Sequence, residues 1–588
     1  NSVIVGLKNK SYIYSLKNLK SMKKHYLFTI TFVGIISMMM IFNGCNSSNK
    51  NKKMEKEFDE FLNTFNEKLI PLYKSSALSS WDANITGKEE DYKKSAEFSF
   101  QLSKLFSDKK DFEKIKKIKE SGAITDTLKK RQLDVLYLEF LGNQLDTTKM
   151  KEIIDMESAI EKKFNVFRAE IGGKAYSDNQ IDQILKNATN SDSLKEAWMA
   201  TKKSGKNVSE DVIKLVKKRN EAAKDLGFAN FHEMKIKLSE QDPQEIENLF
   251  NELDSLTKDG YTKLKNDMDI YLAKQYKIKK EDLMPWHYQD KFFQEAPKIY
   301  DIDLDKYYDK KDIIKVTNDY YKSIGLDISD IISKSDLKAK EGKNQHAFCT
   351  NIDKEGDVRV LCNVVNNEYW MNTMLHEYGH AVYDKYIDKD LPFLLRDPAH
   401  TFTTEAIAEL FGRFATNPVW LKEVIGVSEA DIKKINENVN KSLRLQMLVF
   451  SRWSQVMYRF EKAMYENPDQ DLNQLWWNLV EKYQMIKKPV DRNEPDWASK
   501  IHIAVYPCYY HNYLMGELLA SQLHYYMTEN IIKSDDYSNQ SYFNQPKIGE
   551  FLINHIFKPG AKYEWNEMIE KATGEKLTAK YYAKQFVE

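Results

Sequence analysis

Glycine and proline are scarce in this sequence of 588 residues: 21 Gly and 13 Pro are about half of average usage or less. Residues that break helices are therefore few, and long helices are favoured. Four cysteines are too few for a disulfide scaffold in so long a chain. Neither charge is in excess, since 88 Lys and Arg balance 88 Asp and Glu, which argues against a nucleic-acid-binding protein. An aromatic content of 12% argues against disorder. The composition predicts a large, mainly helical globular protein.

Apolar residues recur at three- and four-residue spacing along most of the chain, a pattern typical of amphipathic helices. The clearest segments are residues 54–73, 91–107, 147–167, 208–226, 243–275 and 431–467. Only one β-hairpin is predicted, in which residues 346–352 and 358–365 alternate around a turn that contains Gly356. The predicted fold class is mainly α with this one small hairpin.

A charged start followed by an apolar run predicts a secretory leader near the N-terminus. Lysines at 23 and 24 precede the apolar residues 27–42, and Gly44-Cys45 follows. A cysteine behind a small residue resembles the lipobox of bacterial lipoproteins, in which Cys45 would be lipidated. The alternative is an uncleaved anchor, because the apolar run is nearly long enough to span a bilayer. In both cases we expect the remaining chain to lie outside the cytoplasm, at the membrane of a bacterial cell envelope.

These patterns divide the chain into three parts. Residues 1–44 are an N-terminal extension with the leader, residues 45–53 are the lipidation site and a polar linker, and residues 54–588 form a single helical catalytic domain. The first part contains six lysines and no acidic residue, which leaves 82 basic and 88 acidic residues in the rest. We therefore expect the exported protein to be modestly acidic.

An HExxH motif at residues 376–380 carries the predicted chemistry. Residues four apart share one face of a helix, so His376 and His380 can present two imidazoles to one metal ion. Glu377 lies beside that face, where it can hold a metal-bound water. Two imidazoles and a carboxylate suit one Zn²⁺ ion and leave a fourth position for water or substrate. The alternative is that both histidines are ordinary core residues.

A candidate third ligand follows 25 residues after the second histidine, in the helical run that begins Thr404-Glu405. A helix, a reversal near Pro392 and a second helix would bring Glu405 to the metal. Glu409, one turn further on, would face the same way and could hydrogen-bond a ligand imidazole from outside. Without the upstream motif, both would be taken for solvated helix carboxylates.

The stretch from His376 to Glu409 resembles the angiotensin-converting-enzyme family of zinc peptidyl-dipeptidases, of which this chain would be a bacterial lipoprotein member. The family shares the HExxH motif, the aspartate-leucine-proline found here at residues 390–392, and a glutamate followed by alanine and isoleucine. Here the spacing between motif and glutamate is one residue longer. Residues 81–86 resemble the family's N-terminal tryptophan-to-asparagine-isoleucine-threonine segment, and Trp476-Trp477 resembles its paired-tryptophan helix.

Over roughly residues 54–588, the resemblance implies an elongated helical zinc-peptidase (gluzincin) fold with two interleaved subdomains. A deep central channel would divide it, N-terminal helices would cover the mouth, and the hairpin would lie beside the HExxH helix. Because a deep channel excludes folded proteins, the implied substrates are oligopeptides.

The family pattern lysine-x-histidine followed by tyrosine-x-x-tyrosine assigns four further site residues by resemblance. His502 and Tyr513 would donate hydrogen bonds to the scissile carbonyl as it becomes an oxyanion. Lys500 and Tyr510 would hold the free C-terminal carboxylate of the peptide. Any of these tyrosines can also be an ordinary core aromatic.

The hairpin region carries further resemblances. His346-Ala347 resembles the family's substrate-binding histidine-alanine pair, and an edge strand there could pair with an extended peptide. Cys349 and Cys362 flank the hairpin where the family has a disulfide; the alternative is two buried thiols. Gln289 is a candidate for the family glutamine that contacts the substrate carboxylate.

Two features depart from the family pattern. One residue is inserted before the tyrosine pair, which leaves Tyr509 and His511 as alternatives for the neighbouring roles. The arginines that bind chloride in the animal enzymes correspond here to Val480 and Asn512, so chloride is not expected.

The resulting hypothesis is a zinc metallopeptidase that releases C-terminal dipeptides from oligopeptides with a free C-terminus. A first alternative is a zinc oligoendopeptidase of the thimet type, whose motif-to-glutamate spacing also fits 25 residues. A second is a non-catalytic surface lipoprotein that binds peptides. The intact Glu377 argues against the second, because a binding protein needs no base beside the metal.

Overall fold

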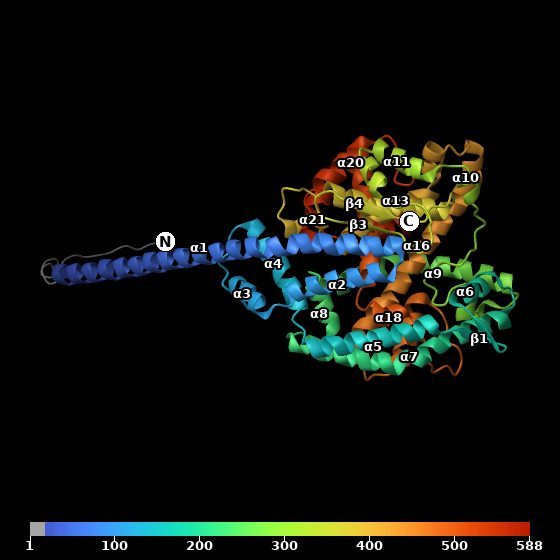
Figure 1. The fold of residues 1–588 in the computed structure, drawn as a ribbon, viewed down its shortest axis with the longest axis horizontal. Coiled ribbons are helices and arrows are strands. Elements are labelled where there is room, and N and C mark those ends of the chain that lie inside the picture. Colours follow the sequence, from blue (N-terminus) through green and yellow to red (C-terminus); the bar gives the residue numbers. More distant parts are fainter. Residues whose placement is uncertain (1–17, 588) are drawn as a thin grey trace, which may run out of the picture.

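The computed structural model describes residues 18–587, with side chains from residue 51 onward. The side chains of the predicted leader and of Cys45 therefore lie outside the described part of the structure. Helix α1 (Asn18–Thr86) is the longest element and extends away from the body at its N-terminal end (Figure 1). Among the residues whose side chains are described, no helix is both long and apolar enough to cross a membrane.

The N-terminal layer consists of α1 and the three helices that follow it, α2 (Glu89–Phe106), α3 (Lys109–Glu120) and α4 (Thr127–Gly142). Asp108 and Asp126 are the N-cap residues of α3 and α4, because their carboxylates accept hydrogen bonds from backbone amides of the first turn. Phe65 of α1 packs against Phe106 and Phe140 with ring centroids 5.4 and 5.5 Å apart. This layer thus has an aromatic core of its own.

The lower half of the molecule in Figure 1 is built mainly from the next elements. They are α5 (Thr147–Val166), β1 (Ala169–Ile171), β2 (Lys174–Tyr176), α6 (Asp178–Asn187), α7 (Ser191–Asp225) and α8 (Phe231–Leu238). Strands β1 and β2 form a second hairpin, so the prediction of only one hairpin is wrong. Its strands have three residues each, too few to reveal alternation, and its turn uses Gly172 and Gly173 at φ of 58° and 76°.

Long helices join the two halves, and the upper half holds the HExxH helix. The remaining helices are α9 (Pro243–Tyr276), α10 (Asp305–Tyr308), α11 (Ile313–Ser323), α12 (Ser329–Lys334), α13 (Glu368–Tyr386), α14 (Thr401–Gly412), α15 (Pro418–Trp420), α16 (Glu429–Glu466), α17 (Leu472–Leu479), α18 (Ile501–Val505), α19 (His511–Tyr526), α20 (Pro546–Leu552), α21 (Trp565–Thr573) and α22 (Lys580–Phe586). All six helical segments predicted from spacing are helices (α1, α2, α5, α7, α9, α16). The mainly α fold class is confirmed.

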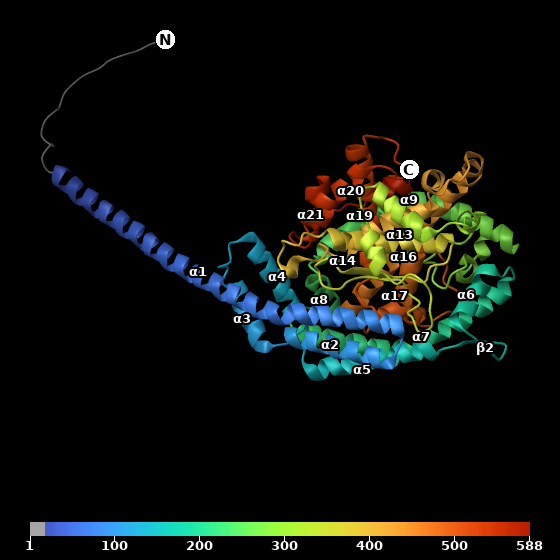
Figure 2. The same cartoon turned by 45° about the horizontal axis from the view of Figure 1, so that its top comes forward.

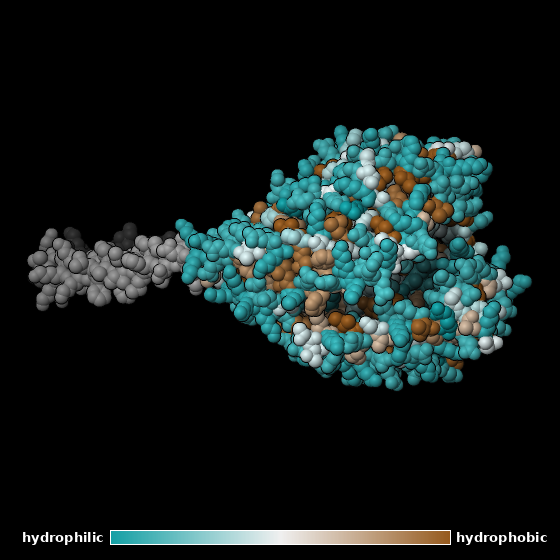
Figure 3. Space-filling model, viewed as in Figure 1, coloured by the Kyte–Doolittle hydropathy of each residue, from teal (hydrophilic) through white to brown (hydrophobic). Residues whose placement is uncertain are grey.

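The predicted hairpin forms β3 (Phe348–Asn351) and β4 (Val358–Leu361), an antiparallel pair beside α13. Helix α1 lies against β3: Tyr73 donates a hydrogen bond to Asn351 O at 3.1 Å, and Trp81 packs edge-on against Phe348. In Figure 2 the projecting part of the same helix slopes toward the body, and its C-terminal part then crosses the body nearly horizontally with α2 beside it. A hollow separates the two halves on the face in Figure 3.

Candidate metal centre and active site

Helix α13 presents the two motif histidines on one face. Asn367 caps the helix by accepting a hydrogen bond from Trp370 N. One turn apart, His376 and His380 lie with ring centroids 5.0 Å from each other. The opposite face, with Met374, packs into the core and fixes the direction of the histidines.

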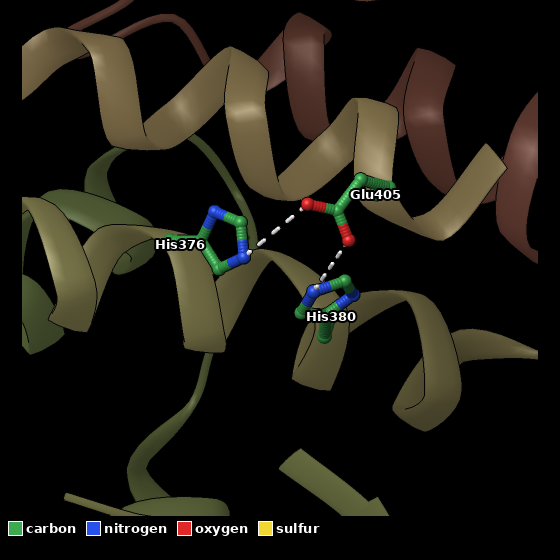
Figure 4. A group of neighbouring side chains, drawn as sticks. All are labelled: His376, His380 and Glu405. Carbon is green, nitrogen blue, oxygen red and sulfur yellow. Dashed lines mark ion pairs between the residues drawn. The ribbon is translucent and has the colours of Figure 1, made fainter. Parts of the chain in front are cut away.

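A glycine lets α14 approach α13 closely enough to complete a three-residue cluster. A Cβ at Gly379 would lie only 2.7 Å from Ala408 Cα, so the two helices cross in backbone contact there. This crossing places Glu405 opposite both histidines (Figure 4). Its carboxylate oxygens lie 3.8 Å from His376 Nε2 and 3.6 Å from His380 Nε2. The three side chains offer ligand atoms within 4.8 Å of one another, close enough to hold one metal ion.

Polar groups behind the histidines fix their orientation. Thr404 Oγ1 lies 2.9 Å from His380 Nδ1, and Glu409 Oε1 lies 3.7 Å from His376 Nδ1. The structure thus brings Glu409 to the predicted position. Thr404 was not anticipated, although its place directly before Glu405 in the sequence is a signal that could have found it. Such outer partners are the usual support of metal-binding imidazoles.

Glu377 is buried, with 8% of its surface exposed, and lines a cavity of about 780 Å³ together with His380. Burial raises the pKa of its carboxyl to about 8. A bound cation would favour the ionised carboxylate and lower this pKa. Its carboxylate therefore lies beside the metal cluster, where it can accept a proton when ionised.

The free edge of β3 forms another wall of this cavity. Ile352 N donates to Asp357 O across the hairpin, so by antiparallel alternation the backbone groups of Ala347 and Cys349 point away from β4. Ala347 and Cys349 both line the cavity. His346, by contrast, is exposed, and its backbone amide bonds to the Asn344 side chain.

Cys349 and Cys362 are free thiols in the structure, which contradicts the expected disulfide. In the strand register Cys349 faces Val360, so Cys362 stands diagonally rather than directly opposite. Burial raises the pKa of both thiols. The alternative of two thiols therefore holds, with Cys362 buried and Cys349 half-buried at the cavity wall.

Of the two predicted oxyanion donors, Tyr513 lies near Glu405 and His502 lies beside Tyr510. Burial and the Glu405 carboxylate both raise the pKa of Tyr513, and Tyr509 has the same surroundings. The Tyr510 ring lies 5.3 Å from that of Tyr513 and 5.4 Å from that of His502. Burial lowers the pKa of His502 to about 4, and its buried Nδ1 has no partner among the described residues.

Tyr509 and His511 are the alternatives to Tyr510 and Tyr513, and only Tyr509 has Glu405 as a neighbour. His511 is buried, and its Nε2 lies 2.7 Å from Gln241 Oε1. Gln241 Nε2 donates in turn to Asn512 Oδ1 at 2.8 Å. Asn512 therefore belongs to a neutral amide network at the place where the resemblance puts an arginine in the animal enzymes.

Lys500 lies on the far side of Tyr510, at the wall of a second cavity of about 490 Å³. Its ammonium bonds to Gln294 and lies 5.6 Å from the Tyr510 ring. Burial lowers its pKa to about 8. The structure does not bring Gln289 to this cavity: its amide oxygen accepts a hydrogen bond from Lys298 N, and the residue is not among those that line the cavity.

Residues 52–586 match the family model described as Peptidase_M2, angiotensin-converting enzyme. The chain belongs to this family. An angiotensin-converting enzyme of Theromyzon tessulatum is 22% identical over 564 residues, covering 90% of each chain. That of Rattus norvegicus is 26% identical over 276 residues, which are 45% of this chain and 20% of the rat protein. The mainly α fold and the resemblance to the angiotensin-converting-enzyme family are therefore both confirmed.

Proposed function

We propose that this chain is a zinc-dependent peptidase that releases dipeptides from the C-terminus of oligopeptides. The main support is one row of side chains: the His376, His380 and Glu405 cluster at one end, tyrosines in the middle, and the buried Lys500 at the other end. Family membership supports a peptidase, and this arrangement supports the finer assignment.

The donor set fits zinc. Two imidazole nitrogens and one carboxylate are the ligands that a catalytic zinc site uses, with one position left for water. Thr404 supplies an outer hydrogen bond to His380, and the Glu409 carboxylate lies 3.7 Å behind His376, where it favours a proton on Nδ1. When bound there, zinc would polarise the scissile carbonyl and make a water molecule more acidic.

Glu377 would act as the general base and later as the acid. Its buried carboxyl can take the proton of the attacking water and deliver it to the leaving amine. Tyr513 would donate a hydrogen bond to the oxygen that gains negative charge, and His502, neutral because its pKa is near 4, would donate a second. Both donors are already held by neighbouring rings, so little reorganisation is needed.

The two ends of the substrate would be held by different chemistry. The open edge of β3 offers Ala347 and Cys349 backbone groups to an extended peptide, as an added strand would require. Lys500, Gln294 and Tyr510 would bind the C-terminal carboxylate by charge-assisted hydrogen bonds. A carboxylate fixed at a set distance from the metal defines the length of the product, which we propose is a dipeptide.

An oligoendopeptidase remains the second candidate, because a peptide bound only along β3 could be cut without its C-terminus. Lys500 favours the dipeptidase, since its buried ammonium forms no ion pair within the described chain and has Asp290 and Glu295 only at longer range, so that a substrate carboxylate could supply the direct partner. Chloride dependence is not proposed, because Asn512 and the buried Val480 carry no charge.

Products from one peptide with a free C-terminus and the same peptide amidated test this function by mass spectrometry. Dipeptide release from the free form alone supports the proposal. Equal internal cuts in both forms would establish the oligoendopeptidase instead. No product from either peptide, with zinc bound in stoichiometric amount, would support the peptide-binding protein.

A further inference from the structure

The segment from α18 to the start of α19 carries three of the side chains that are proposed to bind the substrate. His502 lies in α18, Tyr510 ends the loop between the two helices, and Tyr513 lies in the first turn of α19. The loop is short and irregular, and Cys508 in its middle adopts a left-handed φ of 59°. A residue with a Cβ atom adopts that conformation only at a cost in free energy, so surrounding groups must hold the turn in place.

One such group is the carboxyl of Glu461, which α16 directs at the turn. Its Oε1 accepts a hydrogen bond from Cys508 N at 2.9 Å, and only 2% of the residue is exposed. Within the described chain the carboxyl has no ion pair and no other hydrogen-bond partner. Acidic residues are rarely buried without a paired charge, and burial raises the pKa of this one to about 8. The one hydrogen bond of this buried group therefore goes to the strained residue of the loop.

The Cys508 amide depends on this acceptor. Tyr506 N donates to His502 O at 3.0 Å and ends α18, and Pro507 has no N–H group. Cys508 N is thus the first donor after the helix that needs a partner, and it is buried, where an unpaired N–H is costly. Without Glu461 the middle of the loop would lose both this hydrogen bond and the contact that opposes its strain.

Two further hydrogen bonds fix the ends of the loop. The fully buried Arg219 of α7 donates from Nη2 to Ala504 O at 2.5 Å. Trp453 of α16, two turns before Glu461, donates from Nε1 to Tyr510 Oη at 2.8 Å. An indole N–H can only donate, so the Tyr510 hydroxyl accepts there and its own hydrogen stays free for a substrate carboxylate. The ends are thus held by α7 and α16, and the middle by Glu461.

We propose that Glu461 is a positioning residue of the active site: it fixes the left-handed turn at Cys508 and so places the hydroxyl groups of Tyr510 and Tyr513. This role rests on the proposed function, in which those hydroxyl groups bind the substrate. Glu461 itself lines neither cavity of the site, so its effect on catalysis comes through the loop alone.

Glu461→Met tests this role, because methionine keeps the length of the side chain but offers Cys508 N only a weak acceptor. We expect kcat/KM for a peptide with a free C-terminus to fall about tenfold, while zinc content per chain stays at the wild-type level. Glu461→Gln retains an acceptor oxygen and should stay within about twofold of wild type. The matched control is Glu466→Met, which should change neither quantity, because this exposed residue at the end of the same helix pairs only with Lys462.

A second substitution separates positioning from a general loss of packing. Cys508→Gly removes the Cβ that makes a left-handed φ unfavourable, so it should restore part of the activity that is lost in Glu461→Met. Cys508→Ala keeps a Cβ and should restore none. Equal activity of the two double variants would overturn the role of Glu461, as would wild-type activity of Glu461→Met.

Hydrogen–deuterium exchange followed by mass spectrometry gives a readout that does not depend on turnover. In Glu461→Met the amides of residues 505–513 should exchange faster than in wild type, while those of α13 should not change. A wild-type chain that releases no dipeptide but shows this difference would contradict the proposed function and still support the hold of Glu461 on the loop. Unchanged exchange in residues 505–513 would overturn that hold.

Discussion

At the scale of single residues, the site depends on the different environments of three acidic side chains. Glu405 faces two imidazoles, Glu377 is buried in the cavity wall, and Glu409 stands behind a histidine. The sequence was sufficient to predict these residues, because the HExxH spacing places both histidines on one face of a helix and a second helical run carries Glu405 and Glu409. Supporting contacts were harder to predict: Thr404 could be suspected only from its place directly before Glu405, and Gln294 reaches Lys500 only through the packing of distant segments.

Glu377→Gln should abolish hydrolysis while metal binding persists. The amide keeps the size of the side chain but cannot take a proton, so we expect kcat to fall by a factor of about 10² to 10⁴. Peptide turnover and zinc content per chain are the two measurements. Glu368→Gln, on the same helix but outside the cavity, should leave both unchanged. Turnover of the Glu377 variant at the wild-type rate would remove it from the mechanism.

Asp384 should give the cleft a preference for positively charged substrate side chains on the side of His380. It lines the 780 Å³ cavity and has no hydrogen bond or ion pair within the described part of the chain. Of its neighbours, Asp397 is already paired with Lys354. We expect an N-acetylated peptide with arginine two residues before the cut to be favoured over its norleucine analogue. Asp384→Asn should reduce this ratio of kcat/KM about tenfold.

The same residue predicts a pH dependence. Burial, followed by repulsion from Asp397, raises the pKa of Asp384 to about 7. The carboxyl is therefore mostly neutral below pH 7 and charged above it. The arginine-to-norleucine ratio of kcat/KM should rise as the pH increases from 6 to 8, and should stay flat in Asp384→Asn. Using the ratio cancels pH effects on the chemical step itself, so a flat ratio in the wild type would contradict the assignment.

At the scale of elements, the close crossing of α13 and α14 assembles the metal cluster. Periodicity predicted helices and their lengths well, as α9 and α16 show, but it carries no information on how closely two helices pack. It also could not set the register of irregular segments. Gln289 follows a short 3-10 turn and adopts a left-handed φ of 61°, which directs the chain so that Gln294 meets Lys500 instead.

Gly379→Ala should therefore damage the metal site without touching a ligand. The added Cβ would meet the α14 backbone at 2.7 Å, and overpacking of this kind costs about 1–3 kcal/mol. We expect a lower Tm and weaker zinc binding, followed by thermal unfolding and by competition with a chelator. Gly412→Ala is the matched control, because its Cβ would meet His376 Cβ at an ordinary 3.5 Å. If both variants bind zinc like wild type, the crossing does not control the site.

At the scale of the whole molecule, segments far apart in sequence enclose the cleft. The 780 Å³ cavity has walls from α1, α4, β3, α13 and the segment before α14, so no single stretch could have revealed it. The sequence predicted the channel only through the family resemblance. Charge is likewise distributed by region, since five carboxylates and no lysine or arginine of the described chain line the catalytic cavity.

The predicted anchor can be tested on the whole protein. Residues 1–44 contribute six lysines and no carboxylate, which suits a leader but not the acidic body that follows. Expressed in a bacterium with an alkynyl fatty acid, the chain should be labelled and should begin at Cys45 by mass spectrometry. Cys45→Ser should lose the label, whereas Ser48→Ala should keep it. An unlabelled wild-type chain that retains residues 1–44 would instead be held by an uncleaved anchor. In either case the peptidase activity should persist, because every residue of the proposed site lies beyond residue 54.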